Sequence, residues 1–248
     1  VRDVRARLQK LGILRDSGHE HFTGSIVFPI TDEDGQITGM YGRKSGRALR
    51  AGTPKHLYLP GPHRGFFNAR CVREFREIIL CEAVIDATSF WVNSYRNVTA
   101  SFGTSGFTDE MLQAFVRHHI AKVYIAFDSD PAGDKAALEV AQRLGEQGIA
   151  CVRVQFPEGM DANDFVCQKE FRAELLGELL AQAVPIGLAA VLPLTPPPNP
   201  LPLSALEGPG EGGQSAAEEG NLADALQTSA PEPLAVDQAA REGNVVET

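Results

Sequence analysis

Two carboxylates stand where an apolar segment of the sequence stops and an amphipathic one begins. The segment VYIAF runs into Asp128 and Asp130, and Pro131 follows at once. Two bare carboxylates about 4 Å apart repel each other by roughly 4 kcal/mol at an effective dielectric constant near 20. A divalent cation would remove that repulsion, and oxygen ligands favour Mg²⁺ or Mn²⁺ over zinc. The alternative is that Asp130 only caps the helix that follows, which leaves Asp128 unexplained.

Further acids occupy similar places at two other points of the chain. The apolar segment IILCE ends in Glu82, and Asp86 follows about one helical turn later. Asp161 and Asp164 lie in DANDF, after the apolar segment ACVRVQF. Each acid has a structural alternative, because Asp86 suits a helix dipole and Asp161 and Asp164 suit a turn and a cap. Together they predict that acids from three strand ends converge on one site.

The alternation of apolar and amphipathic segments predicts an α/β fold. Strands are expected at 78–82, 97–103, 122–128 and 150–156, and helices at 84–95, 108–119, 131–148 and 171–184. This spacing is typical of a parallel sheet with helices on both faces. Chemistry in such sheets gathers outside the carboxyl ends of the strands, which is where the acids lie.

A smaller basic α+β region precedes the sheet. We expect a helix at 3–11, a hairpin at 25–43 with the turn DEDG, and a Gly-rich loop at 45–62. The whole chain has a net charge of −9, yet no Asp or Glu occurs between Gln36 and Arg73. The cations of that stretch are Arg43, Lys44, Arg47, Arg50, Lys55, Arg64, Arg70 and Arg73. Such a patch suits phosphate groups, whose binding releases counterions, although a solvated basic surface is the alternative.

The last part of the sequence has a different composition. It is rich in Pro, Gly, Ser and Ala, and Arg241 is the only base among many acids after residue 190. This composition predicts a disordered tail that either solvates the protein or binds a partner as a peptide. Because the sequence begins with Val1 and not with Met, it is compatible with a piece of a longer protein.

The cysteines and the hydropathy pattern indicate the cellular compartment in which the protein is expected. Cys71, Cys81, Cys151 and Cys167 lack the spacing of a zinc site, so we expect no zinc site in this chain and a reducing compartment. No long apolar span occurs, so we expect a soluble, cytoplasmic protein without a membrane partner.

The acidic segments CEAVIDA, FDSDPAGDKAA and DANDF resemble the Toprim domain of bacterial DnaG-type primases, topoisomerases and some nucleases. That family has a Glu at the end of its first strand, a D-x-D after its third and an acidic pair downstream. SFGTSGFTDEML is similar to the intervening primase segment, and the likeness covers roughly residues 26–166. Ala83 departs from the pattern, since a Gly usually follows the Glu. The resemblance implies catalytic acids at Glu82, Asp128 and Asp130, and Mg²⁺ (or Mn²⁺) ligands at Glu82, Asp86, Asp128, Asp130, Asp161 and Asp164.

The basic region carries a second resemblance. Its F-P-I hairpin, followed by Y-G-R and T-P-K, is similar to the basic subdomain of DnaG-type primases, which topoisomerases and Toprim nucleases lack. The likeness implies that Arg43 and Lys55 contact template or nucleotide phosphate, with Arg64 in place of a family Lys. Gly133, in the first turn of its helix, would let a phosphate approach backbone N–H groups.

These patterns predict a basic subdomain at 1–76, a Toprim domain at 77–183 and a disordered acidic tail at 184–248. The expected function is that of a DNA primase, which makes short RNA primers from NTPs on single-stranded DNA by Mg²⁺-dependent nucleotidyl transfer. A Toprim nuclease and a non-catalytic nucleic-acid-binding module are the alternatives.

A replicative helicase or a single-stranded-DNA-binding protein is a further candidate partner. No zinc-binding module, P-loop or helicase-binding domain is recognisable, and an origin on a mobile genetic element is one interpretation.

Overall fold

The computed structural model of the chain describes residues 2–46, 49, 51–168 and 172–187. By its contacts the chain divides into the units Val1–Glu207 and Gly208–Thr248, and all helices and strands described below belong to the first. The predicted disordered tail lies outside the described residues, apart from its first four positions, 184–187. No helix in the described part of the chain combines the length and the apolar character that crossing a membrane requires.

The basic region folds as a helix and a small antiparallel sheet. Helix α1 (Arg2–Lys10) precedes strands β1 (Ser25–Thr31), β2 (Ile37–Lys44) and β3 (His56–Tyr58), which pair in the order β1-β2-β3. The predicted hairpin is confirmed by the pairing of β1 with β2. The prediction of only a loop at 45–62 was wrong, because β3 lies within it and pairs with β2. A three-residue strand is too short to show the alternation of side chains by which strands are recognised.

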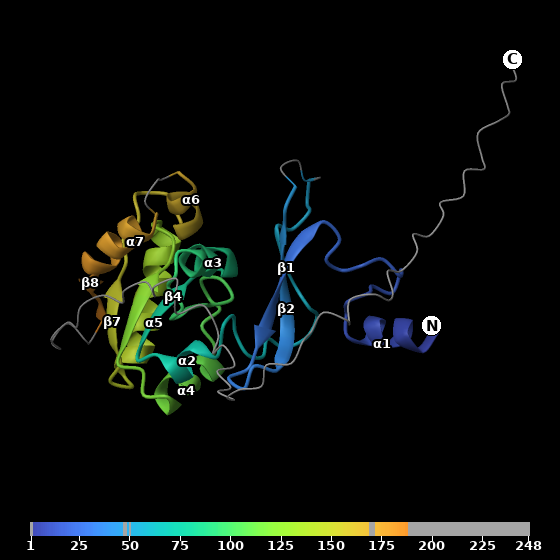
Figure 1. Cartoon of the computed structure of the whole chain (residues 1–248), viewed down its shortest axis with the longest axis horizontal. Helices are drawn as coiled ribbons and strands as arrows, with labels where there is room; N and C mark the ends of the chain where they lie inside the picture. Colours follow the sequence, from blue (N-terminus) through green and yellow to red (C-terminus); the bar gives the residue numbers. More distant parts are fainter. Residues whose placement is uncertain (1, 47–48, 50, 169–171, 188–248) are drawn as a thin grey trace, which may run out of the picture. The chain divides into compact units, whose positions relative to one another are not determined.

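The rest of the described chain forms an α/β layer structure (Figure 1). Its elements are α2 (Cys71–Glu74), β4 (Glu77–Cys81), α3 (Val84–Val92), β5 (Val98–Ala100), α4 (Asp109–Arg117), β6 (Lys122–Ala126), α5 (Pro131–Gly145), β7 (Ala150–Arg153), α6 (Ala162–Cys167), α7 (Arg172–Ala181) and β8 (Val184–Pro185). The sheet order is β5-β4-β6-β7-β8. Every neighbouring pair is parallel except β7 and β8, so the predicted parallel sheet is confirmed with one antiparallel edge strand.

Both faces of this sheet are covered by helices. Ile78 and Leu80 of β4 belong to an apolar cluster with residues of α4 and α5, whereas Ile79 and Cys81 belong to a second cluster with residues of α3, α6 and α7. Alternate residues of a strand point to opposite faces, so β4 feeds both clusters. Burial on both faces explains why the central strands read as continuous apolar runs.

The C-terminal part of the sheet differs in detail from the sequence-based prediction. The helix predicted at 171–184 is observed as α7, which ends at Ala181, and Val184 and Pro185 then form β8. The segment DANDF, for which a turn and a cap were the structural alternative to metal binding, begins the short helix α6 with Asp161 as its N-cap. The sheet therefore extends past residue 183, to strand β8.

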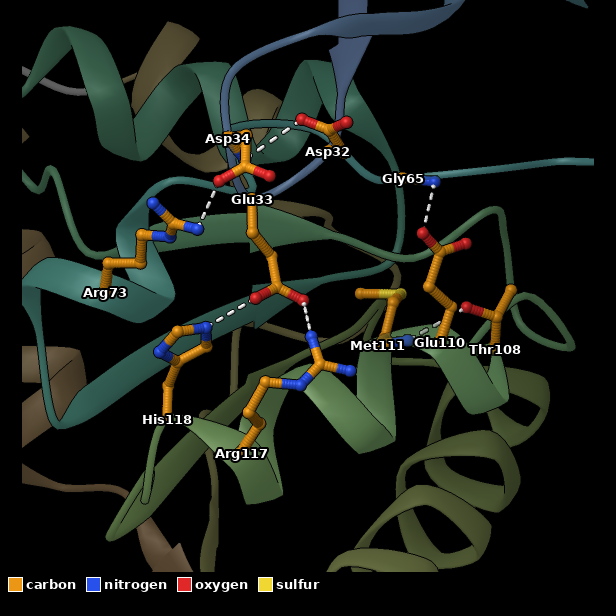
Figure 2. Close-up of polar contacts among 10 residues, drawn as sticks. All are labelled: Asp32, Glu33, Asp34, Gly65, Arg73, Thr108, Glu110, Met111, Arg117 and His118. Carbon is orange, nitrogen blue, oxygen red and sulfur yellow. Dashed lines mark hydrogen bonds and ion pairs between the residues drawn. The ribbon is translucent and has the colours of Figure 1, made fainter.

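The turn between β1 and β2 is joined to the five-stranded part by ion pairs (Figure 2). Arg117 Nη1 donates to Glu33 Oε1 at 2.6 Å, and His118 Nε2 lies 2.5 Å from Glu33 Oε2. Asp34, which lies on the same turn as Glu33, forms an ion pair with Arg73 of α2. The side chain of Glu33 is only 15% exposed, so its interactions are screened less than those of an open surface pair.

We expect Glu33→Gln to lower the free energy of unfolding by about 1–2 kcal/mol, because it removes the charge that two basic side chains share. Chemical denaturation followed by the fluorescence of Trp91, the only tryptophan, measures the change. Asp34→Asn is the matched control from the same turn, since its carboxylate is 70% exposed and should contribute less than about 0.5 kcal/mol. Equal small effects of the two substitutions would contradict a special role for Glu33.

Candidate metal centre

Three carboxylates from separate parts of the chain converge beside the central strands. Asp86 lies in the first turn of α3, Asp128 follows β6, and Asp161 is the N-cap of α6. One carboxylate oxygen from each lies within 4.8 Å of the others. The parallel pairing of β4 with β6 and of β6 with β7 brings the carboxyl ends of these strands to one edge of the sheet. The structure thus brings together three of the six predicted ligands.

Backbone hydrogen bonds hold two of these acids in place. The N–H of Asn163 donates to Asp86 Oδ1 at 3.2 Å, which links α6 to α3. The N–H of Asp164 donates to Asp161 Oδ1 at 2.6 Å, the usual bond of a helix N-cap. Asp86 is buried, with 3% of its surface exposed, whereas Asp128 and Asp161 are half-buried.

Glu82 lies directly after β4 and close to Asp128. The backbone N–H of Asp128 donates to the Glu82 carboxylate, and the negative charge of Asp128 acts on it. Its Oε2 atom is buried and has no hydrogen-bond partner among the described residues. A buried carboxylate oxygen without a donor is costly, so this atom is available to a proton or a cation.

The pKa of each of these acids is raised. Burial, and then the charge of Asp161, raises the pKa of Asp86 to about 8. Burial and the charge of Asp128 raise the pKa of Glu82 to about 7, and burial with the charge of Asp161 raises the pKa of Asp128 to about 6. Burial also raises the pKa of Asp161. Without a cation the cluster therefore retains protons near neutral pH.

These properties fit a hard divalent cation. None of the four carboxylates forms an ion pair with a Lys or Arg within the described ranges, so their charge is not offset by such a partner at close range. Charges at about 4.8 Å repel by roughly 3 kcal/mol per pair at an effective dielectric constant near 20. An all-carboxylate donor set is the kind that Mg²⁺ and Mn²⁺ prefer.

Asp130 and Asp164, the other predicted ligands, lie outside the convergent group of three. Asp130 is exposed and caps α5, where its Oδ1 accepts the N–H of Gly133 at 2.7 Å. The helix-cap explanation is therefore confirmed for Asp130. Asp164 is exposed in the first turn of α6. The charges of both acids contribute to the raised pKa of Asp128, so both lie near the site, and their roles as ligands stay predictions.

Gly133 has a structural reason to be a glycine. A Cβ atom at this position would lie 2.2 Å from the carbonyl oxygen of Asp128. Its N–H is also already bonded to the Asp130 carboxylate. The residue thus lets α5 start directly against the loop that carries Asp128, and a contact with phosphate stays a prediction.

Of the predicted phosphate-binding cations, Arg43 is the one whose charge acts on the acidic group. It is half-buried on β2, hydrogen-bonded to His56, and its charge lowers the pKa of Asp161 against the effect of burial. His56 Nδ1 in turn lies 2.9 Å from the hydroxyl of Tyr41. Burial raises the pKa of that hydroxyl, and the charge of Asp86 raises it further. Lys55 and Arg64 are exposed, and no contact of theirs tests their predicted roles.

Sequence reasoning missed two residues of this region. His56 lies in the segment for which the sequence predicts a loop, and its bond to Arg43 depends on strand β3, which that prediction lacks. Arg153, in the strand ACVR of β7, is 4% exposed and contacts the backbone of Asp128. A lone Arg within an apolar strand was the available signal, because a buried guanidinium needs several hydrogen-bond partners.

Comparison with known proteins defines the class of domain. Residues 79–166, which include all three convergent acids, match the family described as Toprim-like. This part of the chain is thus similar to a Toprim domain, and the proteins similar to the chain include DNA primases and DnaG-type primase cores. A DNA primase of Staphylococcus aureus (strain COL) is 30% identical over 161 residues, which cover 60% of this chain and 26% of that primase.

Solved structures give the same result for the fold. The zinc-binding and RNA polymerase domains of the Aquifex aeolicus primase are similar with a TM-score of 0.58 and 26% identity, over 68% of this chain and 42% of that one. A DnaG primase catalytic domain bound to single-stranded DNA has a TM-score of 0.61 and 25% identity, over 74% of this chain and 60% of that one. The chain spans about a quarter of the length of the curated primases that it matches.

Proposed function

We propose that this chain is the catalytic core of a DNA primase, which joins ribonucleotides into short primers on a single-stranded DNA template in the cytoplasm. The observation that carries the proposal is the convergence of Asp86, Asp128 and Asp161 within 4.8 Å, together with the electrostatic influence of Arg43 on Asp161. A replicative helicase or a single-stranded-DNA-binding protein is the proposed partner class, and NTPs are the proposed substrates.

In this proposal Asp86, Asp128 and Asp161 hold Mg²⁺ or Mn²⁺, with Asp130 and Asp164 completing the site, and Glu82 serves either as a further ligand or as a proton acceptor. The bound cation would supply electrostatic stabilisation of the charge that develops on the transferred phosphate. The residues of the chain supply position: the acids fix the cation, and Arg43 orients the phosphate by a charged hydrogen bond. Lys55 and Arg64 extend the cationic surface along the same subdomain.

Glu82 is the proposed proton acceptor for the 3′-hydroxyl that attacks the α-phosphate. Its pKa of about 7 in the metal-free chain means that this carboxylate can hold a proton near neutral pH, which a general base must do. The half-buried carboxylate also has an oxygen without a hydrogen-bond donor among the described residues, where a proton can be accepted. As a ligand instead, Glu82 would be deprotonated throughout, so the two roles predict different pH profiles.

Incubation of the protein with single-stranded DNA, labelled NTPs and Mg²⁺ tests the function. We expect short RNA oligomers whose formation stops when EDTA is added, because the acidic site would lose its cation. A cleaved template without new oligomers would favour a Toprim nuclease, which shares the acids. Template binding without either product would favour a non-catalytic module. The cations Arg43 and Lys44 of β2 support the primase, since they offer positive charge to template or nucleotide phosphates.

A further inference from the structure

Arg153 is a buried charge at the end of β7, next to the candidate metal centre. Only 4% of its side chain is exposed. Removing a guanidinium from water costs several kcal/mol unless its N–H groups find acceptors and its charge finds a partner. The contacts of Arg153 show how the chain meets this cost.

All three nitrogens of the guanidinium make hydrogen bonds. Nη2 donates to the carbonyl oxygen of Asp128 at 2.8 Å and to Asp134 Oδ1 at 2.9 Å, and Nε donates to the same Asp134 oxygen at 3.2 Å. Nη1 donates to three further carbonyl oxygens, those of Phe127 at 2.8 Å, Val154 at 2.8 Å and Ile125 at 3.3 Å. One side chain thus joins the ends of β6 and β7 to the first turn of α5.

The loop that Arg153 contacts is the one that carries Asp128. Its other constraints are the close approach of Gly133 to the Asp128 carbonyl and the hydrogen bond from the Asp128 N–H to Glu82. Ser129 is also paired with the loop that precedes Asp161, through Ser129 N–H to the Met160 carbonyl at 3.2 Å. The backbone of Asp128 is therefore held at both its carbonyl and its N–H group, and Arg153 supplies the carbonyl contact.

We propose that Arg153 is a positioning residue for the cation site, which keeps the Asp128 carboxylate directed at Asp86 and Asp161 against their mutual repulsion. The inference rests on the proposed function, in which these three acids hold the cation. Only an Arg can make these contacts, because its planar fork offers five N–H donors whereas a Lys offers three around one nitrogen. Residues behind metal ligands commonly set affinity by fixing ligand orientation.

The charge of Arg153 and its geometry act in opposite directions on cation binding. The positive charge counteracts the raised pKa of Asp128 and of Glu82, and by Coulomb's law it also disfavours a cation nearby. Arg153→Lys keeps the charge and removes the fork, so it isolates the geometric contribution. Arg143→Lys is the matched control, because Arg143 also bonds an Asp carboxylate and a backbone carbonyl, those of Asp109 and Phe107.

The test is Mn²⁺ binding to the metal-free chain, measured by titration calorimetry and by electron paramagnetic resonance, with folding checked by circular dichroism. We expect Arg153→Lys to weaken Mn²⁺ binding about tenfold and Arg143→Lys to leave it unchanged. Wild-type affinity in a folded Arg153→Lys variant would overturn the inference, even if the variant melts earlier. A wild-type chain that binds no Mn²⁺ would instead contradict the proposed function.

If Arg153→Lys does not fold, a second variant, Asp134→Asn, tests the positioning role of Arg153. Asp134→Asn keeps every carbonyl contact of Arg153 but removes the charge of its carboxylate partner, whose side chain is 68% exposed. Glu158→Gln removes an exposed charge three residues before Asp161 without touching Arg153, and so controls for lost negative charge. We expect Asp134→Asn to weaken Mn²⁺ binding about two- to fivefold more than Glu158→Gln. Equal effects of the two would overturn the inference.

Discussion

Replacing Asp128 by Asn is expected to abolish Mg²⁺-dependent primer synthesis while making the metal-free protein more stable. The substitution keeps the shape of the side chain and removes one of the three carboxylates whose oxygens lie within 4.8 Å of one another. Relief of repulsion should raise the free energy of unfolding in EDTA by about 1–3 kcal/mol. Loss of a cation ligand should lower the rate of synthesis by roughly a hundredfold or more.

Thermal melts with EDTA and with excess Mg²⁺ measure the stability part of this prediction. The wild type should gain stability from Mg²⁺ because the cation binds only the folded state, and the variant should gain little. Asp109→Asn is the control, since Asp109 is an exposed acid of α4 that pairs with Arg143 away from the cluster. If wild type and Asp128→Asn respond identically to Mg²⁺, the metal role of the acidic group is wrong.

The second large effect expected is that the stability of the metal-free protein falls as the pH rises. The pKa values of Asp86, Glu82 and Asp128 are raised to about 8, 7 and 6, from about 4 in the unfolded chain. Between about pH 4 and 8 the folded state therefore binds more protons than the unfolded state, and stability falls as pH rises. In EDTA we expect the melting temperature to drop by roughly 5–10 °C between about pH 5 and pH 9.

Excess Mg²⁺ should remove most of this drop, because the cation takes over the role of the bound protons. His56 acts in the opposite direction, since burial and then Arg43 lower its pKa and its contribution to stability rises with pH. The difference between the EDTA and Mg²⁺ profiles cancels this histidine effect. A difference that does not change with pH would contradict the raised pKa values of the cluster.

The convergence of the acids could be predicted from the sequence because it needs only topology. Glu82 and Asp128 follow apolar strands, and the carboxyl ends of parallel strands meet at one edge of a sheet. Asp86 was accessible by the same rule, since α3 begins directly after β4. The long parallel strands and the helices between them give strong periodic signals, so most of the fold followed as well.

The parts that sequence did not yield depend on contacts between distant residues. Strands β3 and β8 have three and two residues and exist because β2 and β7 pair with them. Spacing alone placed Asp128 and Asp130 together, whereas the start of α5 turns Asp130 to its own Gly133 N–H. The contacts of Arg153 need the carbonyl groups at the ends of β6 and β7 and the Asp134 carboxylate of α5 around it, which no pattern in ACVR encodes.

The spread of the three acids over successive strand–helix units has a consequence for biosynthesis. A ribosome delivers Asp86 first, Asp128 next and Asp161 last, and domains can begin to fold as they emerge. The central strands β4 and β6 can therefore pair before the Asp161 carboxylate has joined those of Asp86 and Asp128. The three carboxylates come together only when α6 docks, which is also the first moment at which one cation could be bound by oxygens from all three.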